Sequence, residues 1–272
     1  MKRWIIAVLL ILIAAAAGAF RGTSGHFSAS YSTGATADGR EEIRQTYQLS
    51  AGANVEVRGI NGQVTIETSD TTTAEVYILR TASNQADLET RKVTITATPT
   101  SLVIQGENDH SGFWQRLWHG EVKQQVTLKL PRSIALTVKG VNGPVKAGEV
   151  TGALTVSGIN GKVEMAQTNG YSEISGVNGS VTVSFKQLGE KGIRIKGING
   201  AVELRFADKV NADVEARGVN GRVKAELPDV EVQGEAERSK FNARIGTGGV
   251  PINVSGVNGS VRLVRDTTAT SE

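Results

Sequence analysis

The sequence has 272 residues, enough for one large all-β domain, and its 32 glycines and 5% aromatic content favour short strands and tight turns over packed helices. The formal charge of +3 becomes 28 basic against 27 acidic residues once Lys2 and Arg3 are set aside, so there is no basic field for nucleic acid. Cysteine is absent, which excludes disulfides and cysteine nucleophiles.

The N-terminal residues have the pattern of an export signal. Lys2 and Arg3 precede an apolar run and the small residues Ala17-Gly18-Ala19, which predicts a signal peptide over 1–19. A retained N-terminal anchor is the alternative, and it would bring residues 1–20 to a membrane. We therefore expect an exported protein of the periplasm, cell envelope or cell surface.

Two polar stretches flank the predicted domain. Residues 20–40 are small and polar without hydrophobic periodicity, which predicts a flexible spacer. Residues 265–272 predict a disordered tail, so the domain spans 41–264. Its first part is a less regular β portion with five short alternating runs: NVEVRGI, EVYILRT, KVTITAT, SLVIQG and QQVTLKL.

An insertion at 106–120 carries an unusual group of aromatic residues. Phe113, Trp114 and Trp118 lie within it, and Trp114, Leu117 and Trp118 are spaced to share one face of a short helix. This face either covers an open edge of the domain or forms a platform for a sugar or a partner protein. The three aromatic residues are therefore the candidate ligand-binding residues.

A hexapeptide of the form G-[VI]-N-G-x-V occurs seven times. The copies begin at 59, 140, 158, 176, 197, 218 and 256, so the spacing after the second copy is 18, 18, 21, 21 and 38 residues. We interpret the last spacing as two repeats, one of which has lost the motif. A period near 20 is typical of stacked supersecondary units.

Aligned copies keep an apolar residue in the same columns. The residue before each asparagine is aliphatic, although a two-residue hairpin would expose it. A bend at the first glycine explains this column better, because side chains on both sides of the bend then point into one core. We therefore predict a single-stranded parallel β-solenoid (β-helix) with repeats of about 18–21 residues in preference to a sandwich.

The asparagines of the motif should stack along one edge of such a solenoid. Stacked asparagine side chains can bond to their neighbours, as they do in cross-β structures. The predicted turn ladder consists of Asn61, Asn142, Asn160, Asn178, Asn199, Asn220 and Asn258.

The series resembles a bacterial family of exported β-solenoid proteins known as putative adhesins, formerly a domain of unknown function. The resemblance rests on the repeated motif, on LKLP (128–131) and on TGGVPINVSGVNGSVRL (247–263), and it covers roughly residues 45–264. It implies attachment at a surface but no established ligand and no catalytic residue.

Residues for catalysis or metal binding are sparse. His110 and His119 lie in the insertion beside Glu107 and Asp109, but histidines in a polar loop are more often solvated, so we predict neither a metal nor a cofactor. Glu164 and Glu203 share a column with threonine, lysine and arginine, which is typical of a solvated face.

The sequence thus favours a non-enzymatic adhesin that presents a rigid solenoid to a glycan or to an envelope or surface protein. An envelope polysaccharide-active enzyme and a purely structural or regulatory envelope component are the alternatives.

Overall fold

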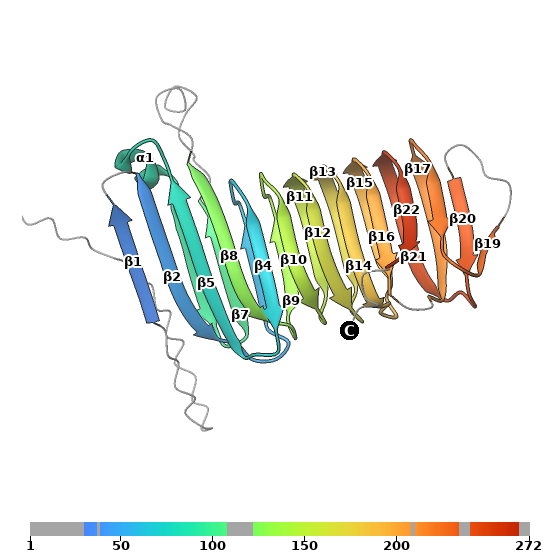
Figure 1. Cartoon of the computed structure of the whole chain (residues 1–272), viewed down its shortest axis with the longest axis horizontal. Helices are drawn as coiled ribbons and strands as arrows, with labels where there is room; N and C mark the ends of the chain where they lie inside the picture. The colour runs from blue at the N-terminus through green and yellow to red at the C-terminus, as the bar shows by residue number, and fades with distance from the viewer. Residues whose placement is uncertain (1–29, 37–38, 108–121, 208–209, 234–239, 267–272) are drawn as a thin grey trace, which may run out of the picture.

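The structure is a computed structural model that describes residues 30–36, 39–107, 122–207, 210–233 and 240–266. This part of the chain is all-β apart from one short helix, α1 (Gln85–Thr90). Its strands form two long sheets of eleven strands each, and the molecule is elongated in the direction across the strands (Figure 1). Each of the five predicted runs forms a strand, so the prediction of an all-β chain is confirmed.

The two sheets, here called sheet A and sheet B, share no strand in the described part of the chain. In spatial order, sheet A contains β1 (Ser30–Thr36), β2 (Arg40–Gln48), β5 (Thr73–Thr81), β8 (Lys123–Pro131), β4 (Val64–Ser69), β10 (Val145–Val150), β12 (Val163–Thr168), β14 (Val181–Gln187), β16 (Val202–Phe206), β22 (Val261–Arg265) and β18 (Val223–Glu226). Sheet B contains β19 (Val230–Val232), β20 (Lys240–Ile245), β17 (Ala212–Val219), β21 (Val250–Asn258), β15 (Ile193–Asn199), β13 (Ser172–Asn178), β11 (Leu154–Asn160), β9 (Ala135–Lys139), β3 (Asn54–Arg58), β7 (Ser101–Gly106) and β6 (Val93–Thr98).

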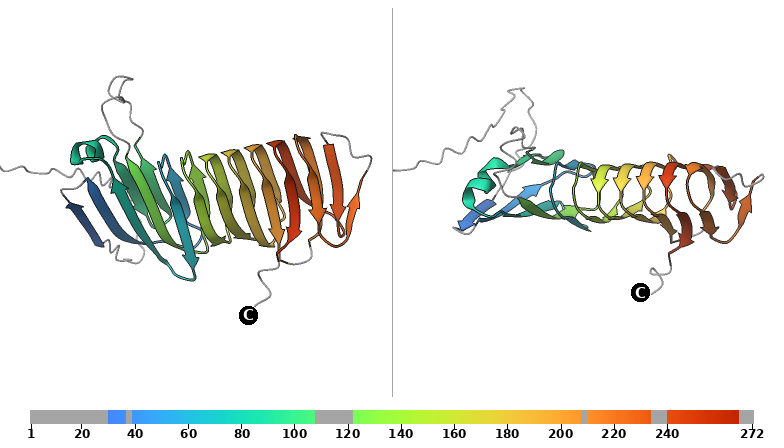
Figure 2. Two further views of the ribbon diagram at one scale, coloured as in Figure 1. Left: turned by 45° about the horizontal axis from the view of Figure 1, so that its top comes forward. Right: turned by 90° about the horizontal axis from the view of Figure 1, so that it is seen from above.

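Each copy of the hexapeptide connects a strand of sheet B to a strand of sheet A, and we call the two strands a strand pair. The seven strand pairs are β3–β4, β9–β10, β11–β12, β13–β14, β15–β16, β17–β18 and β21–β22. Neighbouring pairs run parallel and in register, so Val163 faces Val181 and Val181 faces Val202. The two sheets are therefore mostly parallel, and they lie face to face (Figure 2).

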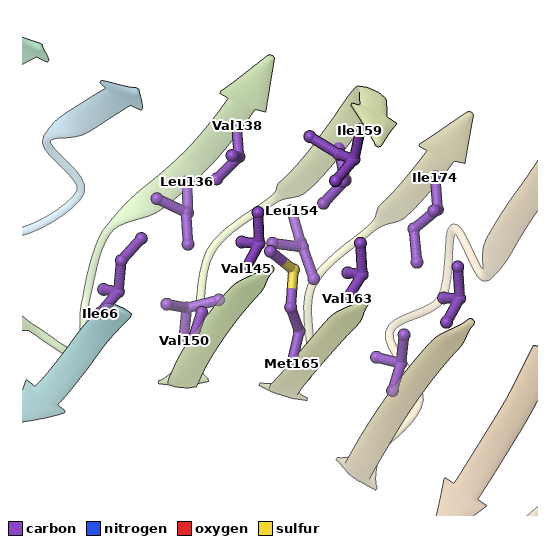
Figure 3. Packing of buried hydrophobic residues seen from close by; sticks show 14 of the residues in the cluster. Ile66, Leu136, Val138, Val145, Val150, Leu154, Ile159, Val163, Met165 and Ile174 are labelled. Carbon is purple, nitrogen blue, oxygen red and sulfur yellow. The ribbon is translucent and has the colours of Figure 1, made fainter. Parts of the chain in front are cut away.

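The core lies between the sheets, as Figure 3 shows for side chains of β4 and β9–β13. The first glycine of each hexapeptide has φ between +59° and +67°, a left-handed conformation that only glycine adopts without strain. This bend turns the next side chain into the core, and Ile159, Val177 and Ile198 are each 1% exposed. The prediction that the residue before each asparagine is buried is confirmed.

Replacing Ile198 with alanine should lower the free energy of unfolding by about 2–5 kcal/mol, because a buried isoleucine loses its contacts and leaves a cavity. In an exposed hairpin position the same substitution would cost well under 1 kcal/mol. Urea unfolding of the two proteins measures the difference. An effect as small as that of Thr182→Ala, on the outer face of β14, would contradict the inward orientation.

The order of the strand pairs in space differs from their order in the sequence. The last pair, β21–β22, lies between β15–β16 and β17–β18. The interpretation of the 38-residue spacing as two repeats is wrong for a different reason, because the described strands between the two copies add no further parallel strand pair. These residues include β19 and β20, and β20 pairs antiparallel with both β17 and β19 at the end of sheet B.

At the other end of the molecule, the order of the strands in space also differs from their order in the sequence. The first pair, β3–β4, lies between β9–β10 and the strands β7 and β8. Antiparallel strands then complete both sheets, β6 on sheet B and β5, β2 and β1 on sheet A. The prediction of a flexible spacer over 20–40 is wrong for Ser30–Thr36, because this segment pairs through its backbone as β1 and needs no apolar pattern to do so.

Candidate functional site

The asparagines of the seven hexapeptides lie along one edge between the two sheets, which we call the asparagine edge. Six of the seven side-chain amides, all except that of Asn61, donate from Nδ2 to Oδ1 of the asparagine in a neighbouring strand pair, over 3.0–3.2 Å. The bonds follow the spatial order of the pairs: Asn61, Asn142, Asn160, Asn178, Asn199, Asn258 and Asn220. Six of the seven side chains are exposed, and Asn61 is half-buried, so the ladder faces solvent.

The second glycine of the hexapeptide allows the close approach that this ladder needs. A Cβ atom on Gly179 would lie 2.3 Å from the carbonyl oxygen of Gly161 in the neighbouring pair. Gly143, Gly200 and Gly259 are in the same situation. The motif therefore contains two glycines for two reasons, a left-handed bend at the first and backbone contact between neighbouring turns at the second.

The insertion with the aromatic residues connects β7 to β8, next to Asn61, which is the first rung of this ladder. Asn61 donates from Nδ2 to the carbonyl oxygen of Val122 over 2.9 Å, and its backbone amide donates to Oε1 of Gln124 over 3.1 Å. Gly106, at the end of β7, packs against Gly59 of the first hexapeptide. Gly106 and Val122, on the two sides of residues 108–121, are thus held at the asparagine edge, where the strand pairs have the hexapeptide.

The candidate binding residues Phe113, Trp114 and Trp118 lie outside the described residues. His110 and His119, considered above as metal ligands, also do. The structure describes residues 106 and 107 at the beginning of their segment and the chain again from Val122.

Replacing Asn178 with alanine should lower the free energy of unfolding by about 1–2 kcal/mol, because the variant loses the bonds to Asn160 and Asn199 on an exposed edge. Thermal unfolding measures the effect. Ser180→Ala, in the same turn, is the control and should stay within about 0.5 kcal/mol of the parent protein. Equal stability of all three proteins would contradict a structural contribution of the ladder.

The outer faces of both sheets carry charges that pair with one another. Glu173 accepts a hydrogen bond from Lys196 over 2.9 Å, and this bond holds the pKa of Glu173 below its ordinary value. Hydrogen bonds from Lys162 and Arg262 lower the pKa of Glu164 and Glu226 in the same way. A carboxylic acid that donates a proton near neutral pH requires a raised pKa, so these three groups are not suited to that role.

The opposite edge contains an open polar hollow of about 460 Å³ that sequence reasoning missed. It lies between three loops that follow strands of sheet A, and its lining includes Gly152, Asn169, Tyr171, Glu190 and Lys191. The hydroxyl group of Tyr171 donates to Glu173 over 3.5 Å. Glycine recurs in these loops at Gly152 and Gly170, but the polar residues that line the hollow share no repeated pattern, so the sequence did not predict the hollow.

Within the described ranges, histidine, aspartate and glutamate do not gather in groups of three or more that could hold a metal ion. The same part of the chain contains no helix with the length and apolar character needed to cross a membrane.

No protein-family model matches the sequence, and no curated protein is significantly similar to it. Solved structures of bacterial proteins are similar to the chain at low sequence identity. A putative cell adhesion protein from Clostridium sporogenes is 11% identical, with a TM-score of 0.39 over 89% of this chain and 100% of that chain. A putative adhesin from Bacteroides fragilis is 10% identical, with a TM-score of 0.29 over 82% and 96%. A putative adhesin from Parabacteroides merdae is 13% identical, with a TM-score of 0.26 over 83% and 96%.

Proposed function

We propose that the chain is a non-enzymatic, exported adhesin in which a rigid β-solenoid presents the asparagine edge and the adjoining insertion for recognition at the cell envelope. Each strand pair with its connections would be one coil of this solenoid. The observation that carries the proposal is where the insertion is attached: Gly106 and Val122, on the two sides of residues 108–121, contact the first hexapeptide, whose Asn61 is the first rung of a ladder of seven asparagines.

Two further features support a recognition surface. Parallel neighbours in register give a stiff support, because every strand pair bonds to its neighbours through both sheets. Charges of opposite sign alternate and partly pair on the outer faces, as Lys196 with Glu173 and Arg262 with Glu226 show, which works against a strong field of one sign. Recognition would then depend on shape and on the aromatic residues of the insertion, for which glycans or an envelope protein are the fitting partners.

The proposal is tested with protein that lacks residues 1–19, screened for binding to glycans, cell-wall polymers and bacterial cells. We expect the double variant Trp114→Ala, Trp118→Ala to bind at least about tenfold more weakly at unchanged thermal stability. The matched control is Tyr171→Ala, an aromatic residue on the opposite edge, which should bind like the parent protein. Binding that is equal in all three proteins would place recognition elsewhere, and turnover of a polymer would favour an envelope polysaccharide-active enzyme.

A purely structural component of the envelope is the second candidate. It is favoured by the mutual hydrogen bonds of the asparagines, which satisfy the edge without any ligand. The absence of binding by the parent protein, together with a loss of stability in the tryptophan variant, would support this candidate and contradict recognition by the insertion.

A further inference from the structure

The last strand pair occupies a slot that the rest of the chain forms. β21 bonds to β15 on one side and to β17 on the other, and β22 bonds to β16 and β18 in the same way. Both walls of this slot therefore precede, in the sequence, the segment Val250–Arg265 that fills it. Figure 1 shows β21 and β22 between the strands of the two walls.

The contacts in this slot depend on the repeat pattern of the segment that fills it. They do not depend on whether that segment belongs to the same molecule. The inward side chains of the inserted segment occupy the shared columns and are at most 2% exposed: Ile252, Val254, Val257, Val261 and Leu263. Its turn, GVNGSV at 256–261, is identical to the turn at 176–181, which lies in the middle of the stack. A segment of the same sequence from another molecule would make the same contacts.

The connection that leads into the slot is a glycine turn held closed by two side chains. Gly246, Gly248 and Gly249 all have positive φ, at 57°, 73° and 112°. Asn211 accepts a hydrogen bond from the backbone amide of Thr247 over 3.0 Å, and Asp213 accepts one from that of Gly249 over 2.8 Å. Once these two bonds and the strand pairing to β15–β16 and β17–β18 are broken, the turn can extend and carry Val250–Arg265 away as a unit. Short hinges that connect an element to the domain are the usual sites of such exchange.

We propose that the slot between β15–β16 and β17–β18 also accepts the segment Val250–Arg265 of a second copy, so that two molecules exchange their last strand pairs. Within one molecule the segment competes at an effective concentration on the order of millimolar, which favours the closed monomer in dilute solution. A crowded surface or refolding at high concentration shifts the balance towards exchange. This inference goes beyond the proposed recognition role and does not depend on it.

The natural absence of cysteine allows a direct test with the full chain. Asn199 and Asn258 are neighbouring rungs on the two sides of the slot boundary, with 3.0 Å between Nδ2 and Oδ1. Adjacent strands lie about 4.8 Å apart, a spacing that a disulfide can bridge. Asn199→Cys and Asn258→Cys are prepared as separate proteins, one with a mass tag, and are then unfolded together, refolded and oxidised. We expect a disulfide-linked heterodimer whose fraction rises with protein concentration.

Two controls make the result specific. Asn160→Cys mixed with Asn178→Cys has equivalent ladder geometry, but its strand pairs follow one another in the sequence, so we expect only background cross-linking. Asp213→Ala removes one bond that closes the hinge and should raise the heterodimer fraction by at least about threefold. Both substitutions in one chain should give a disulfide within the monomer at low concentration.

The proposal is wrong if the mixed variants give no more heterodimer than the control pair at any concentration. A second measurement needs no substitution: the unsubstituted chain, refolded near millimolar concentration, is examined by analytical ultracentrifugation. A dimer fraction that depends on refolding concentration supports exchange, and monomer alone overturns it.

Discussion

Gly179→Ala should destabilise the protein by about 3 kcal/mol or more, while Gly176→Ala in the same turn should cost about 1–2 kcal/mol. Both glycines have positive φ, +59° at Gly176 and +152° at Gly179, but they differ in what an added Cβ would meet. Gly176 has φ of +59°, but the nearest atom to an added Cβ is 3.5 Å away, so alanine would suffer only backbone strain. An added Cβ on Gly179 would lie 2.3 Å from the carbonyl oxygen of Gly161, so the two turns would have to separate.

Separation of the turns would also weaken the bonds that cross them. The amide of Gly179 donates to the carbonyl oxygen of Asn199 over 3.0 Å, and Asn178 bonds to both neighbouring asparagines. Urea unfolding of the parent protein, Gly176→Ala and Gly179→Ala, with an unchanged m value, measures the two losses in free energy of unfolding. Gly176→Asn is an additional control, because asparagine tolerates the left-handed conformation better than alanine. Equal losses for Gly176→Ala and Gly179→Ala would contradict the distinction between bend and contact.

Much of this fold follows from residue types that recur at fixed positions. A valine after every turn and an aliphatic residue before every asparagine can be buried together only if the chain bends at the first glycine. A pattern of this kind predicts strands, inward faces and the column of asparagines, because each of these depends on local spacing alone.

The spatial order of the strand pairs could not be predicted for the same reason. Since all pairs present nearly the same columns, β17–β18 and β21–β22 match β15–β16 almost equally well, and alternation cannot rank them. The strands β19 and β20 decide this order. They can extend sheet B only if one edge of β17 is left for pairing with β20. Pairing of this hairpin depends on contacts between segments that no repeat encodes.

A polar residue in an aliphatic column shows another limit of sequence reasoning. Ser172 occupies a position where the neighbouring pairs have Leu154 and Ile193, and it is fully buried. Its hydroxyl group donates to Oε1 of Gln167, which in turn donates to the carbonyl oxygen of Gly152 over 2.8 Å. Gln167 itself pairs with Phe185 in the next strand. The buried hydroxyl group of Ser172 is satisfied by a residue from a column of the other sheet. Neither column on its own therefore predicts that a polar residue is tolerated here.

Arg80→Met should lower the free energy of unfolding by about 3 kcal/mol, because it removes a buried cation from several partners at once. The side chain of Arg80 is 5% exposed and forms an ion pair with Glu41. Its guanidinium group also donates to the carbonyl oxygens of Leu88 and Arg91, the latter over 2.7 Å. Arg80 thereby connects β5, β2 and the C-terminal end of α1, whose final carbonyl groups have no partner within the helix.

The loss should be concentrated at this end of the molecule. Methionine fills a similar volume but leaves Glu41 and two carbonyl groups without their donor, so hydrogen exchange over 85–91 should accelerate more than exchange in β11–β16. Arg44→Met is the matched control, since Arg44 lies exposed on β2 over the ring of Tyr77, and its loss should cost less than about 1 kcal/mol. A cost for Arg80→Met no larger than that of the control would show that α1 is held by its apolar contacts, with Leu88 as the main anchor.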